Sequence, residues 1–242
     1  MRPYPQAYLI KSAFMPEIPE VHIGVVDAAG AESVSWNDVI VGRMALNECW
    51  NHTPGSRRSL FTFTNAHSVE LWVNGQSMGV QENDTTQANL RNMIYWKDVP
   101  YGNGGSVVAI ARDKSGKEVA RHHIETAGKA VALRIEAETP TDWKADGMDL
   151  QYINVTAIDK KGRPVWDYNK PLTLQMEGAA WLVALDNGDH YTDELFHGIT
   201  SKRMYQGRMQ IILRSTKTPS NVKLEISSAD LKEKLSLKTS LK

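Results

Sequence analysis

The chain has 242 residues, 41% hydrophobic and 23% charged, and this composition excludes a disordered protein. Its 28 basic and 28 acidic side chains cancel, so no net charge draws it toward nucleic acid or an anionic membrane. The single cysteine, Cys49, excludes an internal disulfide and any metal site built from a cysteine pair.

The N-terminal part contains the only clear helix signal. Residues 6–14 form a short apolar stretch, and prolines at positions 16 and 19 predict its end. A strand is expected at 21–26, whereas 36–44 is ambiguous. The first residues lack the charged-then-apolar order of a signal peptide, and their abrupt start suggests a truncated parent. No apolar run is long enough for a membrane-spanning helix, so we expect no membrane insertion. The compartment stays open, with a periplasmic or extracellular parent as one expectation.

From residue 60 onward the apolar residues recur with period two. In 69–73, Val69, Leu71 and Val73 fall on one face of an extended chain, with Glu70 and Trp72 on the other. Asn74-Gly75 then tolerates the positive φ angles of a tight hairpin turn. Similar short strands, separated by glycine-rich turns, are expected at 60–64, 107–111 and 119–124. This spacing is typical of an antiparallel sandwich.

A second series of strands follows the small polar stretch 126–129, which has the composition of a linker. Its strands are expected at 131–137, 150–158, 172–176, 182–185, 209–213, 222–226 and 235–237. The sequence therefore predicts an all-β fold: two tandem immunoglobulin-like antiparallel β-sandwiches preceded by a short helix-containing segment.

Three side-chain pairs resemble catalytic or metal-binding pairs, but each is better explained as an ordinary feature of a strand or loop. Glu136 and Glu138 have strand spacing that suits a glycosidase pair, yet they alternate with apolar residues as on a solvent face. His122-His123 are adjacent in a strand and point to opposite faces, so they cannot readily share one metal. Glu194 and His197 lack the first histidine of a zincin motif. We therefore expect no catalytic residue, metal ligand or cofactor in this chain.

Two features stay open as binding sites. Asp186, Asn187, Asp189, His190 and Tyr191 follow a strand in one polar loop, where they could bind a sugar or cation. Asp-Asn-Gly also turns a chain well, and we favour that simpler interpretation.

Trp72 is the other feature. Its ring lies opposite the apolar face of its strand, so it could be exposed as a sugar platform or pack against a neighbouring domain.

Longer motifs resemble a known family. W-N-H-T-P-G-S and F-T-F-T-N-A-H-S-V-E-L-W-V-N-G-Q-S-M-G resemble the sandwich that follows the catalytic barrel in β-galactosidase-like members of glycoside hydrolase family 2. A-D-G-M-D-L-Q-Y-I-N-V-T-A-I-D-K-K-G-R-P-V, D-N-G-D and Y-Q-G-R-M-Q-I-I-L-R-S resemble the next domain. Residues 6–23 resemble the last barrel helix and the strand leaving it.

The resemblance implies domains at 1–47 (end of the barrel and linker), 48–127 (first sandwich) and 128–242 (second sandwich). It implies a parent that cleaves β-linked sugars with retention, through glutamates on barrel strands that match no residue here. Partners would be the barrel and N-terminal domains of that parent, and an oligo- or polysaccharide. The competing hypothesis is a free-standing carbohydrate-binding or adhesive immunoglobulin-like module.

Overall fold

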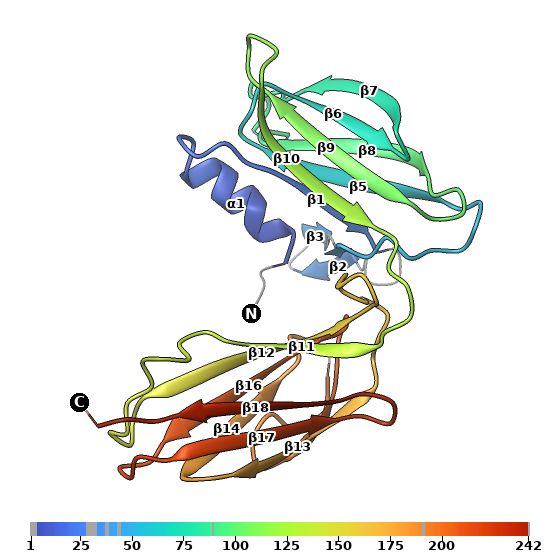
Figure 1. The fold of residues 1–242 in the computed structure, drawn as a ribbon. Helices are drawn as coiled ribbons and strands as arrows, with labels where there is room; N and C mark the ends of the chain where they lie inside the picture. The colour runs from blue at the N-terminus through green and yellow to red at the C-terminus, as the bar shows by residue number, and fades with distance from the viewer. Residues whose placement is uncertain are drawn as a thin grey trace. The chain divides into compact units, whose positions relative to one another are not determined.

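A computed structural model describes residues 4–27, 33–36, 39–42, 45–88, 90–189 and 192–241, with the backbone alone for 33–36 and 39–42. The chain divides into two compact units, 2–126 and 127–242. Each unit holds two four-stranded antiparallel sheets (Figure 1), which confirms the predicted all-β tandem sandwiches with a short preceding helix. Among the described residues, no helix is long and apolar enough to cross a bilayer.

The first unit begins with the predicted helix α1 and is otherwise built of strands. Its elements are α1 (Gln6–Phe14), β1 (Val21–Val26), β2 (Ser33–Trp36), β3 (Val39–Gly42), β4 (Leu46–Asn47), β5 (Arg57–Thr64), β6 (Ser68–Val73), β7 (Gln76–Glu82), β8 (Met93–Pro100), β9 (Ser106–Arg112) and β10 (Glu118–Glu125). The sheets have the orders β4-β1-β5-β8 and β10-β9-β6-β7. The ambiguous stretch 36–44 includes part of the β2–β3 hairpin.

The alternation in β6 sets the core of this unit. Val69, Leu71 and Val73 are buried, and they pack in one cluster with Ile23 of the opposite sheet and with Trp50 of the segment between β4 and β5. The turn that follows has positive φ at both central residues, Asn74 (52°) and Gly75 (79°), as a tight hairpin requires. The hairpin thus has a structural role: β6 fills the core and the turn reverses the chain.

The strands β1 and β4 lie inside the first sandwich. β1 pairs with β5 over five residue pairs and with β4 over two. Both strands fall in the span 1–47 that the family resemblance assigned to the barrel end and linker. They complete one sheet of the sandwich, because β5 needs a partner on the side away from β8.

The second unit repeats the two-sheet plan with its own core. Its strands are β11 (Ala132–Ala137), β12 (Leu150–Ile158), β13 (Pro171–Glu177), β14 (Ala180–Asp186), β15 (Ser201–Arg203), β16 (Arg208–Ser215), β17 (Asn221–Ser227) and β18 (Lys232–Lys238). The sheets have the orders β11-β12-β16-β14 and β15-β13-β17-β18. In β12 burial alternates along the whole strand, so its inner residues Ile153, Val155 and Ala157 enter the core.

Candidate functional site

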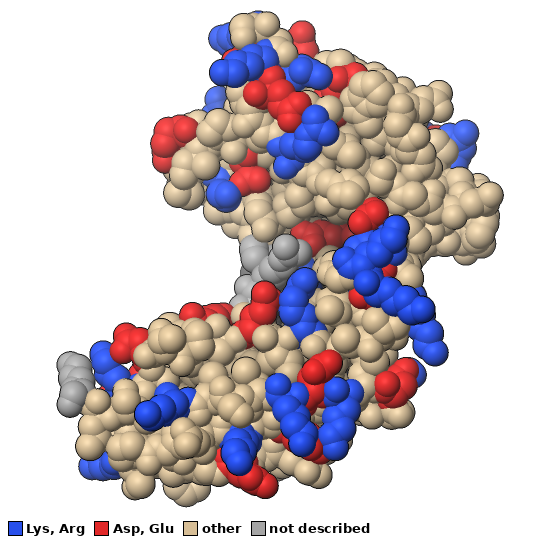
Figure 2. Space-filling model, viewed as in Figure 1, with Lys and Arg blue, Asp and Glu red and all other residues tan. Residues whose placement is uncertain are grey.

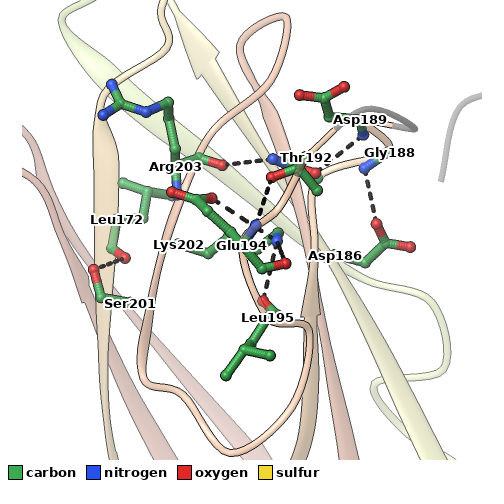
Figure 3. A network of polar contacts seen from close by, with 11 residues as sticks. Leu172, Asp186, Gly188, Asp189, Thr192, Glu194, Leu195, Ser201, Lys202 and Arg203 are labelled. Atoms are coloured by element: carbon green, nitrogen blue, oxygen red, sulfur yellow. Dashed lines mark hydrogen bonds and ion pairs between the residues drawn. The ribbon is translucent and has the colours of Figure 1, made fainter.

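In the polar loop that follows β14, the first side chains form hydrogen bonds with the backbone of the loop itself. Asp186 Oδ1 accepts a hydrogen bond from Gly188 N (2.8 Å), and Asn187 Oδ1 accepts one from Asp189 N (3.0 Å). The buried Asn187 amide also donates to the carbonyl of Arg203 (3.0 Å). Figure 3 shows these contacts, two within the loop and one from the loop to Arg203 of β15. They are the local bonds by which Asx residues make turns, so they support the turn interpretation.

A buried lysine holds the second half of the same loop. Lys202 Nζ donates to the carbonyls of Glu194 (3.2 Å) and Leu195 (3.0 Å), as Figure 3 shows. It also lies 4.2 Å from the centroid of the Phe196 ring. The Glu194 carboxylate is 3.8 Å from this ammonium and accepts a hydrogen bond from Arg203 N. The loop carbonyls therefore face a cation that belongs to the chain itself. A bound metal ion would have to compete with it.

The residues predicted for a ligand loop are only partly assembled by these contacts. Asp186, Asn187 and Asp189 lie in the self-bonded turn, whereas His190 and Tyr191 lie outside the described residues. Lys202 was missed by sequence reasoning. Lys202 lies between the polar residues Ser201 and Arg203 in β15, so the sequence gives no clear sign of which face it occupies. Only the packing reveals that its side chain is buried.

Two tryptophans on different strands, Trp72 and Trp181, differ in exposure. Trp72 is half-buried beside Glu70, whose carboxylate accepts hydrogen bonds from Arg112 (3.0 Å) and Ser77 (3.0 Å). The Arg112 bond holds the pKa of Glu70 below its usual range. Trp181, which the sequence did not single out as a platform, is 60% exposed. It is the most exposed tryptophan among those whose side chains the structure describes.

The candidate carboxylates lie on an open sheet surface. Glu136 is exposed and 3.5 Å from Arg134, while Glu138 accepts a hydrogen bond from Asn154 (3.2 Å). The pKa of a catalytic acid is typically raised by an enclosed apolar pocket, which neither carboxylate has. Their position agrees with the solvent-face interpretation.

A further cluster joins residues far apart in the sequence: His22, Glu48 and His122, whose possible ligand atoms all lie within 4.8 Å of one another. His22 Nε2 is 2.7 Å from Glu48 Oε1, and both residues are buried. The His22 ring is stacked between Tyr8 (3.5 Å between centroids) and His122 (3.9 Å). Two histidines and a carboxylate are a common zinc ligand set, so the geometry needs a test.

The hydrogen bonding of His122 does not suit a metal ligand. Its Nδ1 accepts a hydrogen bond from the backbone N–H of Ile23 (3.1 Å), which places the proton of a neutral ring on Nε2. Metal-bound histidines instead donate through the nitrogen that is not bound to the metal. The arrangement is therefore a polar stack that ties α1, β1 and β10 together. His123 is exposed, so the two adjacent histidines do face different surroundings, as expected.

Charged side chains of both signs are interspersed over the surface seen in Figure 2, in keeping with the zero net charge. A field of one sign, such as binding of nucleic acid requires, is absent from the described part of that view. Electrostatics therefore does not mark out a catalytic or nucleic-acid site.

Comparisons with known proteins agree on one relationship. Residues 133–235 match the family model "Glycoside hydrolase family 2 C-terminal domain 5", and residues 55–120 match "Domain of unknown function (DUF4982)". A β-galactosidase of Bacteroides ovatus is 30% identical over 220 residues, which are 88% of this chain and 25% of that protein. A β-glucuronidase of Formosa agariphila is 26% identical over 158 residues, 64% of this chain and 13% of that protein.

A solved glycosyl hydrolase family 2 member from Bacteroides cellulosilyticus has the same fold. It superposes with a TM-score of 0.86 at 26% sequence identity, over 98% of this chain and 30% of that one. The chain thus spans about a quarter of the first curated relative that it matches.

Proposed function

Because the chain corresponds in sequence and fold to the C-terminal region of β-galactosidase-like enzymes of glycoside hydrolase family 2, we propose that it is their non-catalytic accessory region. Its parent hydrolyses β-linked glycosides with retention of configuration. The sandwiches support the catalytic barrel and contact glycan. The related proteins are named both β-galactosidase and β-glucuronidase, so the class of β-linked sugar substrate carries over, but no particular sugar does.

The observation that carries this proposal is the apolar outer side of α1 and the turn after it. Phe14 is 82% exposed, and Ile10, Met15 and Ile18 are exposed as well. The other side of the helix packs on the sandwich, where Tyr8 stacks on His22 and Lys11 pairs with Glu20. A surface helix normally shows one apolar stripe. An apolar second side supports a further body covering it, and the barrel is the partner that the resemblance implies.

A free-standing adhesive or carbohydrate-binding module is the weaker explanation. Such a module gains nothing from the exposed apolar side chains of this nine-residue helix, because in it no further body covers them. Exposed apolar surface of this kind also favours aggregation when nothing covers it.

The lack of catalytic machinery is tested on the isolated chain. Incubated at high concentration with aryl β-galactoside, β-glucoside, β-glucuronide and β-mannoside, it should give no turnover, because the glutamates expected of the family lie on the barrel. Turnover that survives repurification and is lost in Glu136→Gln or Glu138→Gln would overturn the proposal.

The support of the barrel is tested in the parent enzyme. Phe14→Asp should lower the melting temperature of the parent, since it places a charge in the expected interface. The same substitution should leave the melting temperature of the isolated chain unchanged. Met148→Asp is the matched control, because Met148 is 75% exposed in the second unit. Equal effects of the two substitutions in the parent would contradict a barrel contact at α1.

A further inference from the structure

The outer face of the sheet β11-β12-β16-β14 combines aromatic, amide and charged side chains. The register places Trp181 beside Arg214, Tyr152 beside Ile212, and Asn154 beside Gln210, all on the side away from the core. The alternating inner residues, such as Leu213 and Ile211, are buried in the core. We call this surface the outer sheet face. It is where Glu138 and Asp186 also project.

Two aromatic rings lie apart on this face. Trp181 is 60% exposed on the edge strand β14, and Tyr152 is half-buried on β12. They are separated by two strand spacings across the sheet and two residues along it, a distance of about 12 Å. A register shift between Leu182 and Ala184 bends β14 next to Trp181. Such bulges re-aim side chains near functional sites.

Polar side chains lie beyond Tyr152, on its far side from Trp181, and form a fixed ladder. Gln210 donates to Asn154 Oδ1 (3.1 Å), and Asn154 donates to Glu138 Oε1 (3.2 Å). Gln210 is only 7% exposed, so its amide is held in place. Each amide carries two N–H donors and an acceptor with two lone pairs, more than these bonds use. A rigid row of donors and acceptors next to aromatic rings suits a polyhydroxylated ligand.

The charges on this face select among possible ligands. Three arginines, at positions 134, 208 and 214, stand among the carboxylates of Glu136, Glu138 and Asp186. The face therefore has no net charge, which disfavours nucleic acid, an anionic membrane or an acidic polysaccharide. Its amides and paired charges also differ from the apolar centre of a protein interface. Charge complementarity points to a neutral ligand.

We propose that the outer sheet face binds a neutral β-linked oligosaccharide, with sugar rings stacked on Trp181 and Tyr152 and hydroxyl groups bound by Asn154, whose amide the buried Gln210 holds in place. This inference rests on the proposed accessory function, and it assigns the proposed glycan contact to the outer sheet face. It can fail without the barrel contact at α1 failing, because it is tested on the 242-residue chain alone.

The experiment is affinity electrophoresis of this chain in gels that contain β-1,4-galactan, mixed-linkage β-glucan or glucomannan. At least one of these neutral polysaccharides should retard the wild type. Trp181→Ala and Tyr152→Ala should each weaken binding about tenfold or more, the loss expected when one stacked ring is removed. Leu195→Ala is the matched control, since Leu195 is 63% exposed in the same unit but outside the outer sheet face, and it should bind as wild type does.

Two results would overturn the inference. One is the absence of retardation by all three neutral polysaccharides. The other is unchanged binding by Trp181→Ala, provided its melting temperature matches that of the wild type. Retardation by polygalacturonate or heparin alone counts against it too, because it would show a charge-driven ligand.

Discussion

At the residue scale, the Asn74 side chain makes the β6–β7 hairpin depend on Gly105, a glycine far from it in the sequence. Asn74 Oδ1 accepts a hydrogen bond from Ser106 N (2.8 Å), and Nδ2 donates to Gly104 O (3.0 Å). A Cβ on Gly105 would lie 1.8 Å from Asn74 Oδ1, and Gly105 has φ +119°. The Asn74-Gly75 turn and the loop 102–105 therefore depend on each other for their conformation.

We predict that Gly105→Ala destabilises the first unit by about 2 kcal/mol or more, because clash and backbone strain add. Gly116→Ala is the control, since Gly116 also has positive φ (+83°) but open space around it. It should cost about 1 kcal/mol from backbone strain alone. Urea unfolding midpoints measure both. Equal costs would show that Asn74 moves away freely.

Tyr168 anchors the turn after β17 through a polar network. Its hydroxyl donates to Asp230 Oδ1 (2.6 Å) and contacts Ser228, while Lys170 pairs with Asp230 (2.8 Å). Burial, and then the Asp230 contact, raise the pKa of Tyr168 to about 12. The Lys170 bond, followed by that of Tyr168, lowers the pKa of Asp230 to about 2.

These shifts predict a pH dependence at both extremes. The folded state holds the Tyr168 proton more tightly than the unfolded state, so its contribution is full below pH 10 and lost as pH rises to about 12. The Asp230 contribution is present above pH 3.8 and lost as pH falls to about 2. Tyr168→Phe should flatten the alkaline branch of urea stability and cost about 1 kcal/mol at pH 7. An unchanged alkaline branch would contradict this assignment.

At the scale of elements, the loop between β14 and β15 is organised by Lys202. A fully buried ammonium is costly unless bonded, and here two carbonyls and an aromatic ring receive it. Lys202 therefore fixes the segment around Glu194 and Leu195 against β15.

Lys202→Met should destabilise the second unit by about 2–3 kcal/mol, because it leaves the carbonyls of Glu194 and Leu195 without their donor. The loop should also become more sensitive to protease. Lys234→Met is the control: Lys234 is exposed and its ion pair with Glu225 is 3.5 Å long, so the change should cost less than about 0.5 kcal/mol. If the Lys202 variant were as stable as the control, Lys202 would not anchor this loop.

At the scale of the whole molecule, each compact unit has its own two sheets and its own core. We predict that residues 1–126 and 127–242 fold separately, since no described strand of one unit pairs in a sheet of the other. Each fragment should give a cooperative thermal transition by circular dichroism. If neither does while the full chain unfolds cooperatively, the boundary is misplaced or the units are interdependent.

The sequence by itself determined most of the strands, the hairpin turn at Asn74-Gly75, the two-sandwich plan and the relationship to family 2 glycoside hydrolases. It did not predict β4, β7, β8 or β15. Period-two burial and positive-φ turns are properties of neighbouring residues, so they can be read locally. Only the tertiary structure decided that β1 belongs to the first sandwich, that Lys202 is buried, and that Trp181 rather than Trp72 is the more exposed ring. It also brought His22, Glu48 and His122 together. Those features depend on strand order and register between distant segments, which alternation along one strand does not encode.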